Sequence, residues 1–271
     1  MNKYKLLALD MDGTLLNSEK KISSKTLQAI TELSKSGVNV VLSTGRGLAE
    51  LNDYKDEFKF LNYGVLISGG LVYDFKNKKS IAEHPLSEKQ MLAMLESAKI
   101  ENAMVHLLTL NESIANDSDI EQMENFQMEI YQNMFRENCR RCDDFEKYIR
   151  ENVGKILKFN IYHRSSESRL KSFKRLENLD LTFSFVEGTS LEGSPKNISK
   201  ASGLLELCKF LNIDISETVA VGDAQNDTEI LKTVGLAVAM GNASDEIKKI
   251  ADFVTDDNDH DGISKIVEKY F

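Results

Sequence analysis

The sequence has no long apolar run, little cysteine and no excess of basic charge. None of its apolar segments approaches the roughly 18–20 residues that a helix needs to cross a bilayer. The N-terminal segment MNKYKLLALDMDGTLL carries two lysines and an apolar patch, but Asp10 and Asp12 interrupt that patch before the core of a signal peptide can form. We therefore expect neither a membrane span nor a cleavable leader.

Cysteine is scarce. The three cysteines, Cys139, Cys142 and Cys208, are too few and too unevenly spaced for a disulfide framework. This usage favours a reducing compartment, so we expect the protein to be cytoplasmic. The four histidines are scattered, and their spacing builds no metal cluster.

The charge balance is acidic, because 34 Lys and Arg face 43 Asp and Glu, which gives a net charge of −9. An acidic balance argues against a surface for nucleic acid or for an anionic membrane. The apolar share is nevertheless ample, with 41% hydrophobic and 28% charged residues well mixed along the chain. This composition allows a buried core and excludes global disorder. The length of 271 residues fits one large domain or two ordinary ones.

The first part of the chain alternates short apolar runs with a helical pattern. Residues Lys5–Leu9 form an apolar run that ends at a carboxylate and an Asp-Gly turn, which predicts a buried strand entering a loop. Apolar residues at helical spacing predict a helix over Ser23–Ser36, closed by Gly37. Further strands are predicted at Val38–Leu42 and Gly64–Ser68. This order predicts parallel strands joined by right-handed crossovers.

The pattern changes after about residue 83 and returns near Ala201. Between these points, strands are predicted at Ala103–Leu110, Ile156–Tyr162 and Leu181–Val186, separated by polar stretches such as the helix-prone Asp119–Met134 and the Gly- and Ser-rich Glu187–Lys200. More polar, alternating strands are typical of an antiparallel sheet with helices on one side. We therefore predict a smaller α+β domain inserted at residues 84–195.

The last part repeats the first pattern. It predicts helices around Leu204–Leu211 and Asp227–Val234, and strands at Thr218–Val221, Leu236–Ala239 and Asp252–Thr255. The predicted fold class is therefore α/β, with a Rossmann-like parallel core formed by residues 1–83 and 196–271 and interrupted by the inserted domain.

Four polar clusters follow predicted strands or open a predicted helix. They are Asp10-Met11-Asp12-Gly13-Thr14, Ser43-Thr44-Gly45-Arg46, Lys200, and Gly222-Asp223-Ala224-Gln225-Asn226-Asp227. Ligands of open parallel sheets bind beyond the carboxyl ends of the strands, so this fold would bring the clusters together. Any one cluster alone is also explained by helix capping or turn formation. Their succession in one chain favours a shared site.

These motifs resemble those of the haloacid dehalogenase (HAD) superfamily, and within it the Cof-type sugar-phosphatase branch. The resemblance spans nearly the whole chain and rests on LDMDGTLL, LSTGR, the lysine of ISKASGLLEL, GDAQNDTEIL, and VAMGNASDEIK followed by FVTDDNDHDGI. It implies a HAD-like core with an inserted cap domain, a small phosphorylated substrate and Mg²⁺ as the cofactor.

The chemistry of the predicted site fits that family. Hydrolysis of a phosphate monoester needs its barrier lowered by upwards of about 20 kcal/mol, and a carboxylate nucleophile needs the charge of the ester offset. Mg²⁺ takes hard oxygen ligands, which the side chains of Asp10 and Asp223 and the backbone carbonyl of Asp12 can supply; Asp227 is a further candidate for the metal site. In the resemblance, Asp10 is the nucleophile, and Asp12 protonates the leaving oxygen and then deprotonates water.

The remaining candidates would bind phosphate. Lys200, Thr44 and the backbone N–H groups after Asp12 are predicted to hold the phosphoryl group. Gly13 would let the backbone approach that group closely, although an ordinary turn glycine is the alternative. Lys196, which stands four residues before Lys200, stays an alternative to it, because the family usually has glycine where this chain has Ala201.

Among the further candidates, Arg46 and Asp227 have two interpretations each. Arg46, next to Gly45, can bind a substrate phosphate or carboxylate through its guanidinium fork, or form a structural salt bridge. Asn226 resembles a substrate-contacting position of the family, whereas Asp227 can also cap the next helix. The chain has Gly69-Gly70 where the family often has Asn-Gly, so the substrates of better-known relatives cannot simply be transferred.

Two other motifs point elsewhere. Residues Asp257–Gly262 with Glu268 match the calcium-loop pattern D-x-[DN]-x-[DN]-G-x5-E, but a calcium hand needs an entering helix and the preceding residues predict a strand. Cys139-Arg140-Arg141-Cys142 has zinc-like spacing without a second cysteine pair or a nearby histidine. We predict neither a calcium nor a zinc site.

The sequence thus predicts a magnesium-dependent phosphatase that hydrolyses small phosphorylated metabolites through an aspartyl-phosphate, with the inserted domain as its cap. A phosphomutase and a non-catalytic phosphometabolite-binding protein are the alternatives. The expected partner is a small phosphorylated molecule rather than nucleic acid or a membrane, and we expect a monomer or a weak homodimer.

Overall fold

The computed structural model describes residues 3–271, and the chain folds as two compact units. The core unit comprises the residues up to Gly45, Tyr54–Ala82 and Ser199–Phe271, and the inserted unit comprises Arg46–Asp53 and Glu83–Ile198. Residues 46–53 thus group with the inserted unit, whereas the sequence assigned them to the core. Within residues 3–271, no helix is both long enough and apolar enough to span a membrane.

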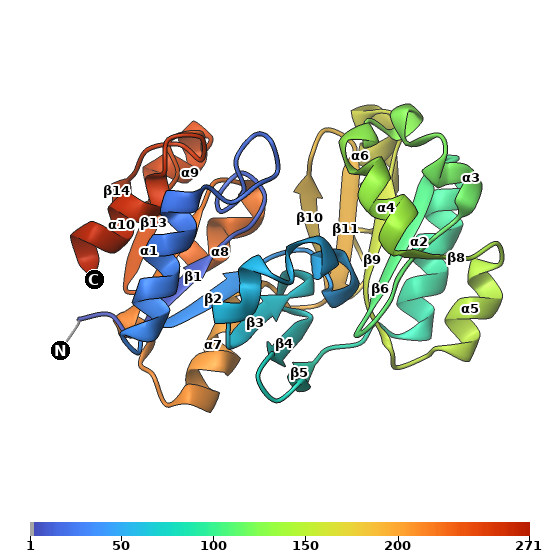
Figure 1. Ribbon diagram of the computed structural model, residues 1–271. Helices are drawn as coiled ribbons and strands as arrows, with labels where there is room; N and C mark the ends of the chain where they lie inside the picture. Colours follow the sequence, from blue (N-terminus) through green and yellow to red (C-terminus); the bar gives the residue numbers. More distant parts are fainter. Residues whose placement is uncertain (1–2) are drawn as a thin grey trace. The chain divides into compact units, whose positions relative to one another are not determined.

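An eight-stranded sheet with the order β14-β13-β12-β1-β2-β3-β4-β5 forms the centre of the core unit (Figure 1). All neighbouring pairs from β14 to β3 are parallel, and β4 runs antiparallel to β3. The parallel core confirms the predicted α/β class. The strands are β1 (Leu6–Leu9), β2 (Asn39–Ser43), β3 (Tyr63–Leu66), β4 (Leu71–Asp74), β5 (Lys79–Glu83), β12 (Thr218–Gly222), β13 (Leu236–Ala239) and β14 (Phe253–Val254).

Helices cover both sides of this sheet, as its apolar strands require. On one face, Ala8 and Val41 belong to the same buried cluster as Leu204 of α7 and Ile230 of α8. Helix α1 packs against α10 and β2, and Figure 1 shows α1 and α7 on opposite sides of the strands. The helices are α1 (Ser24–Lys35), α7 (Lys200–Leu211), α8 (Thr228–Leu231), α9 (Asp245–Ile250) and α10 (Gly262–Tyr270), with 3-10 turns η2 (Glu57–Phe60), η3 (Ile67–Gly69), η6 (Ile215–Glu217) and η7 (Gln225–Asp227).

The turn after β3 differs from the prediction of a strand over Gly64–Ser68. The strand ends at Leu66, and Ile67, Ser68 and Gly69 follow with φ of 54°, 54° and 92°. These left-handed residues turn the chain back into β4, which the apolar pattern does not reveal. A Cβ at position 69 would collide with the carbonyl oxygen of Ser199, the N-cap of α7. The glycine therefore lets η3 pack tightly against the start of α7.

The inserted unit contains a six-stranded sheet with the order β10-β11-β9-β6-β7-β8, antiparallel except for the parallel pair β7 and β8. Its strands are β6 (Met104–Thr109), β7 (Ser113–Ala115), β8 (Cys139–Arg141), β9 (Ile156–Tyr162), β10 (Leu181–Val186) and β11 (Ser190–Pro195). Strand β11 lies in the segment predicted to be a polar connection. Its pairing with β9 and β10 offsets its low apolar content.

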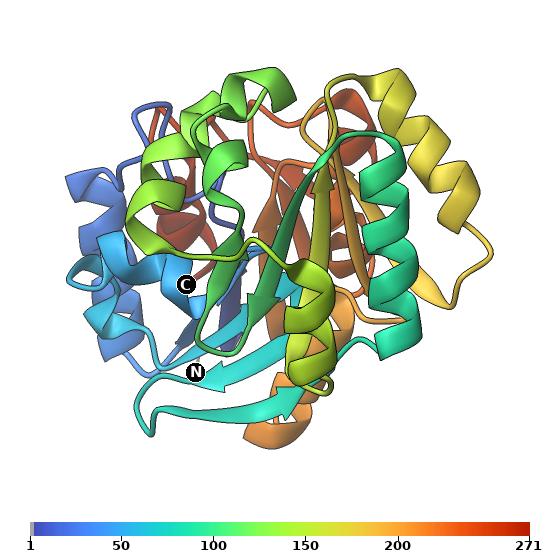
Figure 2. The ribbon, with the colours of Figure 1, turned by 90° about the vertical axis from the view of Figure 1, so that its right-hand side faces the viewer.

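Helices α2 (Glu88–Ile100), α5 (Phe145–Glu151) and α6 (Ser166–Leu176) bury one face of this second sheet. Leu107, Phe159 and Leu191 of the sheet pack with Met94 and Leu95 of α2 in one apolar cluster. Helices α2 and α6 contact each other, and Figure 2 shows them side by side in teal and yellow.

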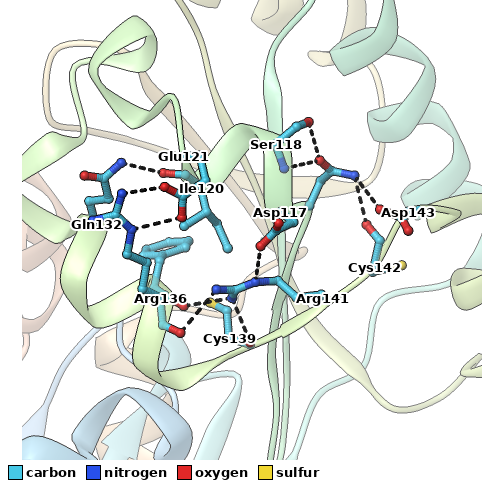
Figure 3. Close-up of polar contacts among 12 residues, drawn as sticks. Asp117, Ser118, Ile120, Glu121, Gln132, Arg136, Cys139, Arg141, Cys142 and Asp143 are labelled. Atoms are coloured by element: carbon cyan, nitrogen blue, oxygen red, sulfur yellow. Dashed lines mark hydrogen bonds and ion pairs between the residues drawn. The ribbon is translucent and has the colours of Figure 1, made fainter.

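The chain between β7 and β8 is held by short polar contacts (Figure 3). Arg141 of β8 donates to Asp117 over 2.6 Å, and the amide of Asn116 donates to the carbonyl oxygen of Cys142 over 3.3 Å. The predicted helix-prone stretch Asp119–Met134 is not one helix. It is divided among α3 (Asp117–Ile120), η4 (Met123–Phe126), η5 (Glu129–Tyr131) and the start of α4 (Gln132–Asn138), while η1 spans Leu48–Tyr54.

Candidate active site

Three adjacent parallel strands deliver the first candidate residues. Strands β12, β1 and β2 are neighbours, paired in register from Leu6 to Leu9. They end immediately before Asp223, Asp10 and Thr44 respectively. Carboxyl ends of parallel strands share one edge of the sheet, so residues distant in sequence meet there. The backbone N–H of Asp10 also donates to the carbonyl oxygen of Val221 over 3.0 Å, which extends the pairing to the first aspartate.

Three carboxylates gather at this edge. Asp10, Asp223 and Asp227 each place a carboxylate oxygen so that all three atoms lie within 4.8 Å of one another. The ammonium group of Lys200 contacts Asp10 Oδ1 and lies 2.7 Å from Asp227 Oδ1. Lys200 is only 1% exposed, because it is the first residue of α7 and points into the unit. This arrangement places one buried cation among three acidic groups.

Of the two lysines that the sequence left open, Lys200 lies in the cluster. Lys196 belongs to the inserted unit and pairs with Asp180 over 2.6 Å, with 60% of its side chain exposed. The helix explains the difference. Because α7 begins at Lys200, as predicted for the residue that opens this helix, Lys200 is a buried first-turn residue, whereas Lys196 lies before the helix.

Burial sets the electrostatics of the cluster. It raises the pKa of Asp10 well above its usual range; Lys200 opposes this shift, and Asp227 and Asp223 add to it. Burial likewise raises the pKa of Asp223 to about 6. Burial disfavours the charged form of Lys200, but the negative charges of Asp10 and Asp227 outweigh it and raise the pKa of its ammonium. The carboxylates therefore carry more negative charge than one ammonium balances, a situation that attracts a further cation.

Asp227 accepts hydrogen bonds from the loop after β12 and from the first residue of α7. Its Oδ1 accepts from Lys200, and its Oδ2 accepts from the backbone N–H groups of Asp223 and Ala224 at 3.1 and 3.2 Å. The side chain is 1% exposed. A Cβ at Gly222 would stand 2.5 Å from Asp227 Cγ, so the absence of a side chain there is necessary. Asp227 thus holds Lys200 and the 223–224 backbone in place.

The loop after β1 fixes Asp223 from the other side. Thr14 donates its hydroxyl hydrogen to Asp223 Oδ1 over 2.7 Å. Gly13 has φ of +81°, and a Cβ there would collide with the Asp223 carboxylate. The backbone of this loop therefore passes close to the Asp223 carboxylate, and the approach of Gly13 to a phosphate stays a prediction.

The other predicted phosphate ligands are distributed between the units. Thr44 is buried and joins the β3 side of the sheet through its N–H, which donates to Val65 over 2.9 Å. Gly45 is the last residue of that core segment, whereas Arg46 groups with the inserted unit, where its guanidinium lies 3.3 Å from Met134 Sδ. In the described part of the chain, the buried Oδ1 of Asn226 has no hydrogen-bond partner. An orphaned buried oxygen in this loop fits contact with a ligand or an ordered water.

Sequence reasoning missed Lys20 and Asn242. The Nζ of Lys20 lies 2.9 Å from Asp12 Oδ1, and Asn242 Nδ2 donates to the carbonyl oxygen of Gly13 over 2.8 Å. Lys20 gave no signal, since a lysine in a polar turn is ordinarily solvated. Asn242 lies within the quoted motif VAMGNASDEIK, and only the fold brings that motif to the loop after β1.

The calcium-like motif has a structural role. Two-residue strand β14, not a helix, precedes it. Asp259 accepts hydrogen bonds from the N–H and hydroxyl of Ser18 at 2.9 and 2.6 Å, and Asp261 accepts from Ser23. These carboxylates serve as acceptors for the chain itself.

The Cys-x-x-Cys pair spans strand β8 and the residue after it. Cys139 Sγ lies 3.0 Å from Ser113 Oγ, and burial raises the pKa of the Cys139 thiol to about 12. The absence of a zinc site at this pair stays a prediction.

A family model described as haloacid dehalogenase-like hydrolase matches residues 7–267. The chain belongs to this family. The match confirms the resemblance inferred from the motifs.

Relatives and a solved structure extend that finding. The chain is 29% identical over 98% of its length to the 5-amino-6-(5-phospho-D-ribitylamino)uracil phosphatase YcsE of Bacillus subtilis, covering 95% of that protein. It is 26% identical to a phosphoglycolate phosphatase of Methanobrevibacter smithii, over 97% of each chain. A crystal structure of a haloacid dehalogenase-like hydrolase from B. subtilis superposes with a TM-score of 0.88 at 26% identity, over 98% of this chain and all of that one. This family member is a phosphoric monoester hydrolase.

Proposed function

We propose that this phosphatase hydrolyses phosphate monoesters of small metabolites with Mg²⁺, through a phosphoryl group carried transiently on Asp10. The observation that carries the proposal is the grouping of Asp10, Asp223 and Asp227 oxygens within 4.8 Å around the buried Lys200. A structural role alone rarely retains several buried carboxylates beside one cation, because their mutual repulsion is costly.

The donor set fits Mg²⁺. Carboxylate oxygens are the hard ligands that this ion prefers. Burial and the neighbouring carboxylates raise the pKa values of Asp10 and Asp223, and a bound cation would favour the charged form of both side chains. Asp10 and Asp223 would hold the ion with the Asp12 carbonyl, while Asp227, whose two oxygens already accept from Lys200 and the loop, would act beside it. When bound, the ion would offset the negative charge of the ester and of the carboxylates.

The side chains then divide the reaction into two steps. A carboxylate oxygen of Asp10 attacks phosphorus, the bond from phosphorus to the leaving oxygen breaks, and Asp12 gives its proton to that oxygen, which departs as an alcohol. Asp12, now a carboxylate, takes a proton from water while the water oxygen attacks phosphorus. The bond to Asp10 breaks, inorganic phosphate leaves, and both aspartates return to their starting forms.

Residues around the cluster of Asp10, Asp223 and Asp227 are proposed to bind the phosphoryl group. Lys200 supplies a fixed positive charge, and Thr44 supplies a hydroxyl donor. Gly13 brings backbone N–H groups close; Asn226, whose buried Oδ1 has no hydrogen-bond partner among the described residues, would instead accept a hydrogen bond from the substrate. Such preorganised donors stabilise the charge of the transition state without reorganising as it forms.

The inserted domain predicted at residues 84–195 is proposed to act as a cap, and the chain passes from the core unit to the inserted unit between Gly45 and Arg46. A cap limits the site to small substrates and excludes bulk water during turnover. The named relatives act on a phosphorylated ribitylaminouracil and on phosphoglycolate, so the family accommodates different leaving groups. We extend only the class, small phosphorylated metabolites, to this chain.

The test is hydrolysis of a chromogenic phosphate ester with and without Mg²⁺. Wild type should release inorganic phosphate only with Mg²⁺, and Asp10→Asn should lose activity by at least about 10⁴-fold with an unchanged circular dichroism spectrum. Asp53→Asn, at an exposed aspartate of the inserted unit, is the matched control and should behave as wild type. Activity retained by Asp10→Asn would remove the nucleophile. An isomerised sugar phosphate in place of free phosphate would indicate a mutase.

A further inference from the structure

The Asp12 carboxylate has a charged partner from outside the cluster of Asp10, Asp223, Asp227 and Lys200. The ammonium of Lys20 donates to Asp12 Oδ1 over 2.9 Å. The side chains of Lys20 and Asp12 are 36% and 28% exposed, so the pair is shielded from water more than an ordinary surface pair. Hydrogen bonds between charged groups are stronger than those between neutral groups, and partial burial limits the screening of the two charges by salt.

The backbone of Lys20 is fixed by a tight turn. The N–H of Asn17 donates to the carbonyl oxygen of Lys21 over 2.9 Å, and the N–H of Lys20 donates to the carbonyl oxygen of Asn17 over 2.9 Å. Asn17 Oδ1 accepts from the N–H groups of Glu19 and Lys21. Lys20 itself has φ of +58°, a left-handed conformation that lysine rarely adopts. A residue in this conformation persists only where its surroundings impose it, and such residues cluster at functional sites.

Two further groups hold the same turn from outside. The Tyr54 hydroxyl donates to the carbonyl oxygen of Lys20 over 2.9 Å. On the other side, Asp259 accepts from the N–H and hydroxyl of Ser18, and Asn258 Nδ2 donates to Leu16 O at 2.8 Å. The acidic motif near the C-terminus thus anchors the turn that carries Lys20.

The consequence concerns the direction of the Asp12 side chain. A proton carrier must be aimed at the leaving oxygen and then at water, and displacement by about 1 Å can cost about 100-fold in rate. A carboxylate has two oxygens and can rotate. Fixing Oδ1 on a rigid ammonium fixes the plane of the group and therefore the direction of Oδ2.

We propose that Lys20 is a positioning residue for Asp12, held by the strapped turn so that the acid–base carboxylate keeps one orientation through both steps. The inference rests on the proposed function, because it assigns Lys20 to the proton transfers of that reaction. In this proposal Lys20 acts through Asp12, whose Oδ1 accepts from its ammonium, and it does not itself take part in the bond changes at phosphorus.

The experiment compares Lys20→Met with Lys21→Met in the Mg²⁺-supplemented hydrolysis assay. Lys21 is the matched control, because it follows in the same turn and pairs with Glu19 at 3.1 Å, with both side chains 73% exposed. Lys20→Met should lower kcat by about 10- to 100-fold with KM within about twofold, and Lys21→Met should match wild type. Lys20→Arg, which keeps a cationic donor, should recover most of the lost kcat.

A double variant separates positioning from structure. In the background of Asp12→Asn, adding Lys20→Met should cause no further loss, since the two residues act as one unit. Equal losses in Lys20→Met and Lys21→Met, a change confined to KM, or additive losses in the double variant would each overturn the proposal. Wild type without any Asp10-dependent hydrolysis would instead overturn the proposed function, and this assignment with it.

Discussion

Thr14 and Asp223, 209 positions apart in the chain, are joined by a hydrogen bond of 2.7 Å from the threonine hydroxyl to Asp223 Oδ1. Thr14 follows β1 and Asp223 follows β12, the strand that pairs beside it. The bond leaves the carboxylate of Asp223 with a fixed orientation at the edge where Asp10 lies. A ligand oriented in this way binds a metal ion more tightly than one that must be ordered first.

Replacement of Thr14 therefore tests the proposed metal site separately from the proposed bond changes at phosphorus. Thr14→Val should raise the Mg²⁺ concentration needed for half-maximal hydrolysis by about 10- to 100-fold, with kcat at saturating Mg²⁺ largely retained. Thr14→Ser keeps the hydroxyl and should stay near wild type. The measurement is a Mg²⁺ titration of initial rate. An unchanged Mg²⁺ requirement in Thr14→Val would show that Asp223 needs no such support or binds no metal.

The two lysines that flank the second boundary of the inserted unit offer another matched comparison. Lys200→Met should lower kcat by at least about 100-fold, because it removes the buried charge between Asp10 and Asp227. Lys196→Met should leave the rate within about twofold of wild type, since this lysine pairs with Asp180 at an exposed position of the inserted unit. Initial rates at saturating substrate decide the matter, and a larger loss in Lys196→Met would reverse the assignment.

Much of this site was predictable because it is local in sequence. Asp10, Asp12 and Gly13 stand directly after an apolar run, and Asp223 stands after another, so strand ends and candidate ligands are visible together. Because parallel strands end at the same edge of a sheet, the candidate ligands are expected to lie together once the strands are recognised. The fold class follows from the same pattern, and the structure confirms it.

The misses have a different physical origin. Lys20 reaches Asp12 only through a left-handed backbone imposed by Tyr54 and the C-terminal loop, and no local propensity announces that conformation. Strand β11 is formed by its neighbours rather than by its own apolar residues. Residues 46–53 group with the inserted unit through contacts such as that of Glu50 Oε1 with His106, 3.6 Å apart. Tertiary contacts decide such cases, and a single sequence does not contain them.

Gly13 and Gly37 both have a left-handed backbone, and comparing them separates the cost of that conformation from the cost of a collision with a neighbouring side chain. Gly13 and Gly37 have φ of +81° and +95°, but a Cβ at position 37 meets nothing within 4 Å. Gly37→Ala should lower the free energy of unfolding by about 1–2 kcal/mol, the cost of the left-handed backbone, with unchanged activity. Gly13→Ala should add the collision with the Asp223 carboxylate and abolish Mg²⁺-dependent hydrolysis.

Urea titrations of both variants, read by circular dichroism, give the stability term, and hydrolysis assays at increasing Mg²⁺ give the functional term. Equal behaviour of the two variants in both measurements would mean that Gly13 is only a turn residue. Activity in Gly13→Ala at wild-type Mg²⁺ would separate the loop after β1 from the metal site.

The inserted unit makes a pH-dependent contribution to stability through His106. The imidazole bonds to Ser113 Oγ at 2.7 Å and to the Tyr162 hydroxyl at 3.0 Å, and it is 1% exposed. Burial, with Lys158 nearby, lowers the pKa of His106 from 6.5 to about 3. Below pH 6.5 the unfolded chain binds a proton that the folded chain does not. The free energy of unfolding is therefore highest, as far as His106 decides it, above pH 6.5. It decreases by about 1.4 kcal/mol for each pH unit below that value.

His106→Gln should accordingly be less stable than wild type at pH 7.5 and lose about 2 kcal/mol less than wild type between pH 6.5 and 5. The measurement is urea unfolding by circular dichroism at the three pH values, since the chain has no tryptophan to report by fluorescence. His260→Gln is the control, because His260 is exposed and its pKa is raised by the Asp257 carboxylate; it should keep the wild-type loss of stability or deepen it. A His106→Gln protein that loses stability in parallel with wild type would show that a different group, one that binds a proton more readily in the unfolded chain, produces the slope; His163, whose pKa burial also lowers, is one such group.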